Sequence, residues 1–347
     1  MIWLSWRQLR AQAAVAAVAV LAVAVVAGLT GPRLADLARS SASVFDLLTG
    51  TDTTLFYAGV LLMALAPALV GAFLGAPLVA RELEAGTYRL AWTQSVSRRR
   101  WLASKLTLTV AAAALALGAA SLAVTWWSAS LDGAVSQTHG GLPEHLTPVT
   151  FAMRGVVPVG YAAFAVILGA TAGAVLRRTL PAMAVTLALY AALQVVVPIW
   201  VRPHLVPPVS STIAFSRSTL DGVSLEGSGR VLVSVHTADR GDWILVNETV
   251  GPDGKAALLP QWFADCLPGP AGPAAPATPL SPQTQHAQAG SIDDCLTRLT
   301  QAGYRQRVVY QPADRFWPLQ WAETGVYAVA SAALAAGCFW WVRRRLT

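Results

Sequence analysis

The chain has 347 residues, of which 55% are hydrophobic and only 12% are charged. Together with a mean hydropathy of +0.51, this composition excludes an ordinary water-soluble domain and indicates a protein of the lipid bilayer. The formal net charge of +7 needs no nucleic-acid partner, because a basic rim that meets anionic headgroups accounts for it. We therefore expect membrane lipids, and no nucleic acid, among its partners.

Charge-free runs mark the predicted membrane spans, since about 30 Å of hydrocarbon requires roughly 20 apolar residues in a helix. Such runs occupy residues 11–30, 55–80, 106–131, 155–176, 179–201 and 324–342. A secretory signal peptide also begins with basic residues and an apolar core, but further runs follow the first one here, which favours a retained span. The expected fold class is an all-α integral membrane protein with six transmembrane helices.

Basic residues gather on one side of these spans. If the N-terminus is cytoplasmic, the cytoplasmic segments include residues 81–105, with six of the 25 Lys and Arg residues, and the basic tail after the last span. Positive charges resist translocation, so we expect both termini in the cytoplasm and a location in the plasma membrane.

The long segment 202–318 then falls outside, between the membrane region 1–201 and the last span with its tail, 319–347. We expect a small extracytoplasmic α/β or irregular insertion there. Alternating residues predict strands over 230–236, 242–246 and 307–310. Cys266 and Cys295 flank a linker rich in Pro, Ala and Gly, where either a disulfide or two free thiols fits the sequence.

No pattern for catalysis or nucleotide binding is found in the sequence. A P-loop needs Gly-Lys followed by Ser or Thr, but Lys105 precedes Leu106 and Lys255 precedes Ala256. No metal-ligand spacing appears, and the five histidines all lie in predicted outer loops. We expect no catalytic residues, and no cofactor or metal bound by this chain.

Polar residues are few within the predicted spans. Gln194 fits an interhelical hydrogen bond or a contact with cargo, and Arg154 and Glu323 lie near predicted outer ends. No proton relay, buried carboxylate or cationic pair is evident. This absence argues that energy for any transport comes from outside the chain.

Small residues and prolines predict how the spans pack. Gly71 and Gly75 in the second span, and Gly169 and Gly173 in the fourth, form Gly-x-x-x-Gly pairs that allow helix backbones to approach closely. Three prolines fall within spans and predict kinks. They are Pro67, Pro77 and Pro198.

The segment 81–105 combines basic and acidic residues. We expect the second span to continue to a helix stop at Gly86, and Ser95 or Ser97 to cap the next helix. The next helix starts with four predicted membrane-interface anchors. They are Arg98, Arg99, Arg100 and Trp101.

Lipid anchoring alone explains these arginines but not Glu82 and Glu84. Carboxylates are unfavourable at an anionic membrane surface, so the two acids suggest a basic protein partner that docks there.

Residues 81–106 resemble the loop after the second helix of ABC-2 type transporter permeases. Their sequence is R-E-L-E-A-G-T-Y-R-L-A-W-T-Q-S-V-S-R-R-R-W-L-A-S-K-L. The resemblance depends on the acid-x-x-x-Gly-Thr core and on a later Ser-Arg before a hydrophobic helix. Residues 3–9, W-L-S-W-R-Q-L, are similar to that family's N-terminal amphipathic interface helix, with Trp3 and Trp6 as anchors.

This resemblance implies a cytosolic ABC ATPase subunit that binds ATP and Mg, and a second permease chain in a homodimer. Transferred by position, five residues would form or support the ATPase-docking surface: Glu82, Glu84, Gly86, Thr87 and Arg89. The chain departs from many family members in the length of segment 202–318, where they have a shorter connection.

The leading hypothesis is the permease subunit of a bacterial ABC exporter that moves a lipophilic drug, an antibiotic or a lipid-like cargo. The chain would not be an enzyme, since its partner hydrolyses ATP. The alternative is a membrane-anchored sensor or assembly protein that binds a ligand or partner through the outer segment. An intramembrane enzyme fits worst, because no catalytic constellation is visible.

Overall fold

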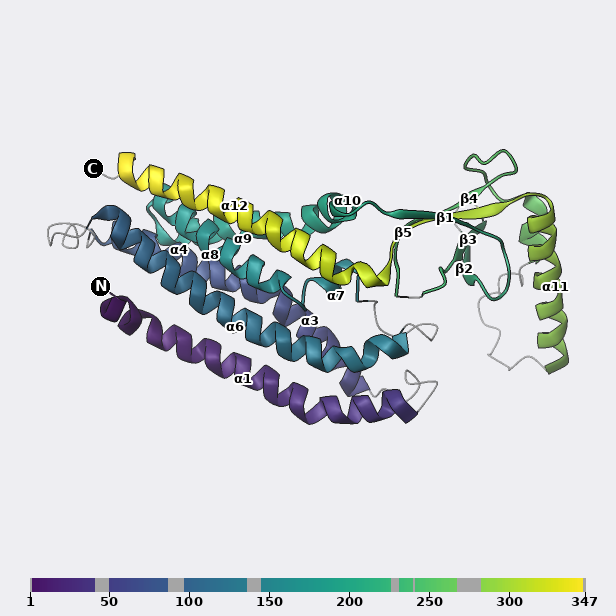
Figure 1. The fold of residues 1–347 in the computed structure, drawn as a ribbon, viewed down its shortest axis with the longest axis horizontal. Helices are drawn as coiled ribbons and strands as arrows, with labels where there is room; N and C mark the ends of the chain where they lie inside the picture. Colours follow the sequence, from purple (N-terminus) through teal and green to yellow (C-terminus); the bar gives the residue numbers. More distant parts are fainter. Residues whose placement is uncertain are drawn as a thin grey trace. The chain divides into compact units, whose positions relative to one another are not determined.

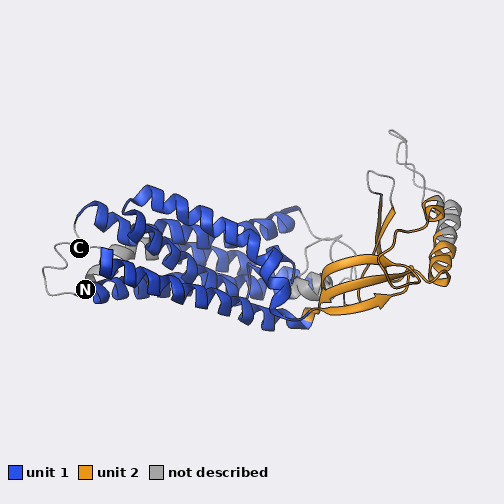
Figure 2. Ribbon diagram, turned by 90° about the horizontal axis from the view of Figure 1, so that it is seen from above, with its two compact units in different colours: residues 1–207, 314–347 blue, residues 208–313 orange. Residues whose placement is uncertain are grey.

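The computed structural model describes residues 2–40, 50–86, 97–135, 145–225, 231–239, 241–266 and 282–345. The chain divides into two compact units (Figure 2). Unit 1 comprises Met1–Pro207 and Asp314–Thr347, and unit 2 comprises Pro208–Ala313. The residues at the start of the predicted insertion and those after 313 thus belong to the helical unit.

Unit 1 is a bundle of long helices (Figure 1). Its elements are α1 (Ile2–Ser40), α3 (Gly50–Val70), η1 (Gly71–Gly75), α4 (Ala76–Glu84), α6 (Arg98–Val135), α7 (Pro148–Phe151), α8 (Val157–Leu176), α9 (Thr179–Val196), η2 (Val197–Val201), α10 (Arg202–Leu205), η4 (Ala313–Arg315, which begins in unit 2) and α12 (Phe316–Arg345). Among the described residues, six helical stretches are long and apolar enough to cross a membrane. Each overlaps with one of the predicted charge-free runs, so the prediction of six spans is confirmed at the level of helices.

The first helix differs from its prediction. α1 runs without a break from Ile2 to Ser40, whereas a separate interface helix over residues 3–9 was expected. No Gly or Pro lies between residues 2 and 27, so nothing in the local sequence ends a helix before the span begins. Trp3 and Trp6 lie in this helix, and their side chains are outside the described part of the structure.

The two Gly-x-x-x-Gly pairs meet each other. A Cβ added to Gly169 would lie 2.2 Å from the backbone O of Gly71, and one added to Gly173 would lie 2.5 Å from that of Ala76. In the opposite direction, a Cβ on Gly75 would lie 2.5 Å from the Val166 O. Only glycine allows backbones this close, so the second and fourth spans pack through these residues. The sequence predicted close packing at each pair, but not that the two pairs face each other.

Two of the spans contain a π-helical turn in front of a proline. In η1 the Ala76 N donates to the Gly71 O, and Pro77 follows. In η2 the Arg202 N donates to the Val197 O, and Pro203 follows. A proline ring clashes with the carbonyl four residues earlier, and a π turn widens the helix at that point. A π turn thus occurs in front of Pro77, where a kink was expected. Pro198 lies within the π turn that precedes Pro203, and α3 continues through Pro67.

Unit 2 contains two small antiparallel sheets and a helix. A three-stranded sheet has the order β1-β5-β4, and β2 pairs with β3. The bounds are β1 (Val209–Ile213), β2 (Leu220–Leu225), β3 (Val231–Val235), β4 (Trp243–Val250), η3 (Gln261–Cys266), α11 (Pro282–Gln301) and β5 (Arg305–Gln311). The predicted strands correspond to β3, β4 and β5. The chain is therefore mostly helical, and its strands lie within the segment where an α/β or irregular insertion was expected.

A hydrophobic core holds unit 2 together. Phe215, Phe263, Leu296 and Val308 are buried in one cluster that joins the sheets to α11. A disulfide links Cys266 to Cys295, and so links η3 to α11. Most of the predicted Pro-rich linker lies outside the described residues.

Candidate functional site

The second span ends at Gly86. The Ala85 N donates to the Arg81 O at 3.0 Å, and the Gly86 N donates to the Leu83 O at 3.4 Å. Gly86 has a φ of +71°, a left-handed conformation in which glycine avoids the penalty of a side chain and closes the last helical turn. The expected helix stop is confirmed. Thr87 and Arg89 lie outside the described residues.

Glu82, in the last turns of α4, binds two side chains of α6. Its carboxylate forms an ion pair with the Lys105 Nζ and accepts a hydrogen bond from the Trp101 Nε1 at 3.2 Å. The Lys105 Nζ also lies 5.1 Å from the centre of the Trp101 ring. The side chains of Lys105 and Glu82 are 10% and 23% exposed. This partly open pair joins the two helices on either side of segment 87–96.

The start of α6 explains why Trp101 and Lys105 face α4 together. Ser97 caps the helix, since its Oγ accepts from the Arg100 N at 3.3 Å and its O from the Trp101 N at 3.0 Å. Trp101 and Lys105 are then four residues apart, on one face of the helix. Ser95, the other predicted cap, lies outside the described residues.

Glu84 binds the start of a third helix. Its carboxylate accepts hydrogen bonds from the Thr179 N at 3.1 Å and from the Thr179 Oγ1 at 2.7 Å. A carboxylate at the N-terminus of α9 satisfies an amide that has no partner within the helix and suits the helix dipole. Five residues thus form what we call the helix junction of α4, α6 and α9. They are Glu82, Glu84, Trp101, Lys105 and Thr179.

This arrangement differs from the expectation for several site residues. Glu82 and Glu84 were expected to face a basic partner, whereas in the structure their carboxylates bind neighbouring helices of the same chain. Trp101 was expected at the membrane interface, but only 2% of it is exposed, because its indole packs between α6 and α4 while its N–H reaches Glu82. Arg99 and Arg100 are exposed and Arg98 is half-buried.

The opposite end of unit 1 contains a fully buried ion pair. The Arg202 Nε lies 2.6 Å from the Glu323 Oε2, and both side chains are 0% exposed. The Arg202 Nη2 also donates to the Glu323 Oε1 at 3.1 Å, and the Tyr161 OH donates to the same oxygen. The guanidinium lies 4.2 Å from the centre of the Phe151 ring. The expectation that no buried carboxylate or cationic pair exists is therefore wrong.

A pattern in the sequence could have revealed this pair. Arg202 directly follows the fifth charge-free run, and Glu323 directly precedes the sixth. Consecutive spans run in opposite directions, so these two ends lie on the same side of a membrane, where opposite charges can meet. Glu323 was expected near an outer span end and Arg202 at the start of the outer segment, without a link between them.

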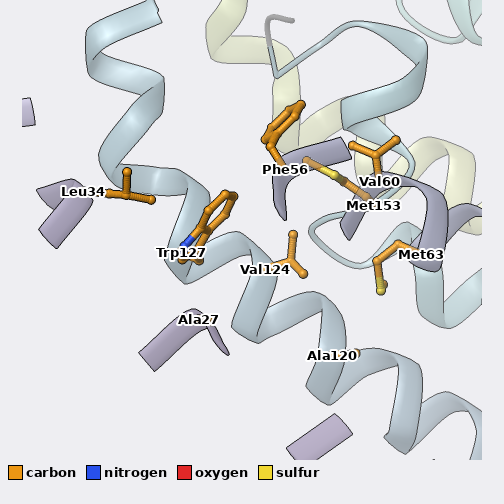
Figure 3. Packing of buried hydrophobic residues seen from close by; sticks show 9 residues of the cluster. All are labelled: Ala27, Leu34, Phe56, Val60, Met63, Ala120, Val124, Trp127 and Met153. Carbon is orange, nitrogen blue, oxygen red and sulfur yellow. The ribbon is translucent and has the colours of Figure 1, made fainter. Parts of the chain in front are cut away.

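An apolar pocket of about 260 Å³ lies between α1, α3 and α6. Phe56, Val124, Trp127 and Met153 are among its lining residues, and Figure 3 shows them with other buried side chains of this region. The Phe56 and Trp127 rings stack with centroids 6.4 Å apart. Among the described residues, no group of three or more His, Cys, Asp or Glu side chains could hold a metal ion.

These features define a class: a multi-pass membrane protein with six helices apolar enough to span a membrane, three of which are joined by the helix junction. The model of a protein family, ABC-2 membrane transporter related, matches residues 9–202. This range is more than half of the chain, so the chain belongs to that family and is an ABC transporter permease. No match was found among curated proteins or among solved structures. The matched range leaves unit 2 uncovered.

Proposed function

We propose that this chain is the permease subunit of an ATP-driven exporter, working as a homodimer with a separate cytosolic ATPase. Family membership implies association with an ABC ATPase in general. The observation that carries the proposal for this chain is the helix junction, where two acids of α4 bind α6 and α9. It provides a route by which movement of one cytoplasmic segment changes the packing of three spans.

The junction would act as a mechanical link. The segment between Gly86 and Ser97 connects α4 to α6, and a partner that binds there would displace the ends of both helices. Glu82 transmits such a displacement between α4 and α6, and Glu84 transmits it to α9 through Thr179. Packed helices respond to small shifts by moving between discrete arrangements, so the ATPase can switch the bundle between two states.

The ATPase would supply the chemistry. ATP and Mg²⁺ would be bound by the partner, and this chain would bind cargo and change conformation. We infer the ATPase as energy source from the family match. The absence of buried charges cannot support this inference, because the Arg202–Glu323 pair is buried. All hydrogen-bonding atoms of the Glu323 carboxylate are engaged with Arg202 and Tyr161, which supports a structural role for this pair.

The apolar pocket supports a lipophilic cargo. It lies among spans whose surfaces face lipid, and its lining is made of aliphatic and aromatic side chains such as Leu62 and Phe56. Burial of apolar surface stabilises such a ligand by roughly 25 cal/mol per Å². A drug, an antibiotic or a lipid-like molecule has the required surface.

The orientation we propose places both termini in the cytoplasm. Figure 1 shows that α1 begins and α12 ends at the same end of the bundle. The start of α6 lies beside the end of α12, and together they bring Arg99, Arg100, Arg343 and Arg344 to that end. Positive charges favour the cytoplasmic side of the plasma membrane. Unit 2, with its disulfide, would then lie outside, where thiols oxidise.

Co-purification tests the proposal. The full chain is expressed together with the ATPase encoded beside its gene, and the tagged chain is purified in mild detergent. We expect a stable complex whose ATP hydrolysis is inhibited by vanadate. Recovery of the folded chain without any ATPase would contradict the proposal.

Unit 2 favours a second candidate, the membrane-anchored sensor or assembly protein. A separately packed unit with its own core and disulfide suits binding of an external ligand or partner. Deletion of residues 208–313 separates the two functions. An exporter keeps ATPase association and part of the coupled ATP hydrolysis, whereas a sensor loses its response.

A further inference from the structure

A second, strongly basic pocket lies between the start of α6 and the end of α12. Its volume is about 930 Å³. Four arginines line it, two from each helix, together with two aromatic side chains: Arg99, Arg100, Arg343, Arg344, Phe339 and Trp340. We call this site the basic pocket.

Within the described part of the structure, no acidic side chain compensates the charges of the basic pocket. No acidic side chain is among its lining residues, and none of the four arginines forms an ion pair with a described residue. The Arg344 guanidinium lies 5.2 Å from the centre of the Trp340 ring, which leaves its charge in place. The start of α6, capped by Ser97, adds the positive end of a helix dipole. Four guanidinium groups around one hollow repel one another, and an anion would relieve this repulsion.

The walls of the pocket point to a lipid rather than to a soluble anion. Phe339, Trp340 and two alanines give it an apolar side, and Trp340 is 49% exposed. Both helices continue from the pocket into membrane spans. Arginines at headgroup level, next to an exposed indole, match the boundary between phosphates and acyl chains.

We propose that the basic pocket binds the headgroup of an anionic phospholipid, with its phosphate among the four arginines and its acyl chains along α6 and α12. Guanidinium groups bind phosphate oxygens in a bidentate manner. Because two arginines come from each helix, a lipid with two phosphates engages both helices at once. The site therefore prefers cardiolipin over phosphatidylglycerol, and phosphatidylglycerol over phosphatidylcholine. A bound lipid would join α6 to α12 close to the helix junction. The proposal does not depend on the transported cargo.

Native mass spectrometry of the full chain in mild detergent, titrated with each of these three lipids, tests the site. The pocket variant combines Arg99→Gln with Arg343→Gln. The control combines Arg81→Gln with Arg178→Gln, which removes the same charge at the same end from exposed residues outside the pocket. We expect cardiolipin binding to weaken about tenfold or more in the pocket variant, and less than about threefold in the control.

Three results would overturn the proposal. Equal losses in the two variants would show only a general attraction to the basic rim, and equal binding of cardiolipin and phosphatidylcholine would show no anion site. Inorganic phosphate that competes with cardiolipin at equal concentration would identify a site for soluble anions instead of a lipid. If the pocket variant aggregates, Arg100→Gln with Arg344→Gln provides a second variant with the same expected loss.

Discussion

The two ends of the unit 1 bundle each contain an ion pair, and the two pairs differ in their access to water. In the Arg202–Glu323 pair both side chains are 0% exposed. In the Glu82–Lys105 pair the two side chains remain 23% and 10% exposed. A sealed pair cannot exchange partners without leaving a buried charge, whereas a partly open pair can exchange its partner for water or protein. One end therefore fixes the packing of the bundle, whereas the contacts at the other end can change when another protein binds.

The largest expected effect comes from breaking the sealed pair. Glu323→Leu leaves the Arg202 charge buried without its partner and should lower the free energy of unfolding by about 3–5 kcal/mol. Thermal unfolding in detergent measures this loss. Arg217→Gln removes one side of an ion pair whose side chains are 60% and 50% exposed, and serves as the control with little expected change. A Glu323→Leu protein as stable as the control would contradict the claim that Arg202 and Glu323 form a buried ion pair.

A smaller loss is expected where the second and fourth spans touch between the two ends. Gly169→Ala places a methyl group 2.2 Å from the Gly71 O, so the helices must separate, at a cost of about 1–3 kcal/mol. Gly337→Ala is the matched control, since nothing lies within 4 Å of its added Cβ. Equal unfolding temperatures for the two variants would mean that the backbones do not pack this closely.

Removal of both charges of the sealed pair should restore part of the lost stability. The double variant Arg202→Met, Glu323→Leu has no unpaired buried charge, so we expect it to regain about 2 kcal/mol relative to Glu323→Leu alone. A double-mutant cycle of unfolding free energies measures this coupling. Strictly additive losses would show that the two side chains act independently.

The smallest effect on stability is expected at the open pair. Glu82→Gln should cost about 1–2 kcal/mol, less than Glu323→Leu, because the Glu82 and Lys105 side chains are not sealed from water and the amide can still accept from Trp101. Its effect on function should be much larger, since the tie between α4 and α6 is lost. Unfolding temperature and ATP hydrolysis by the assembled complex are measured on the same preparation. A fall in stability as large as that of Glu323→Leu would remove the contrast between the two ends.

The sequence allowed accurate prediction of features that depend on neighbouring residues. Charge-free runs located the six spans, Gly86 marked a helix end, and Ser97 was one of the two serines expected to start the next helix. Each of these features follows from a local requirement. Charged residues are excluded from hydrocarbon, glycine is favoured at a positive φ, and a side-chain oxygen is favoured at a helix cap.

Features that depend on distant residues could not be predicted in the same way. Glu323 meets Arg202 across 121 positions, and Glu84 meets Thr179 across 95. Local charge patterns say where such residues lie relative to the membrane, but not which side chain they bind. For the same reason the sequence predicted Trp101 to be an interface anchor, whereas its side chain is buried beside Glu82. The packing of α4 against α6 decides its role.

The most direct test of the account is a double-mutant cycle on ATP hydrolysis by the reconstituted complex, with Glu82→Gln, Lys105→Met and the double variant. If Glu82 acts through Lys105, each single variant lowers the coupled rate to a similar extent and the double variant is no worse than either. If Glu82 instead faces the ATPase, Glu82→Gln lowers both the rate and the recovery of the complex, while Lys105→Met leaves both near wild type. That second result would contradict the helix junction as the link between the ATPase and the spans.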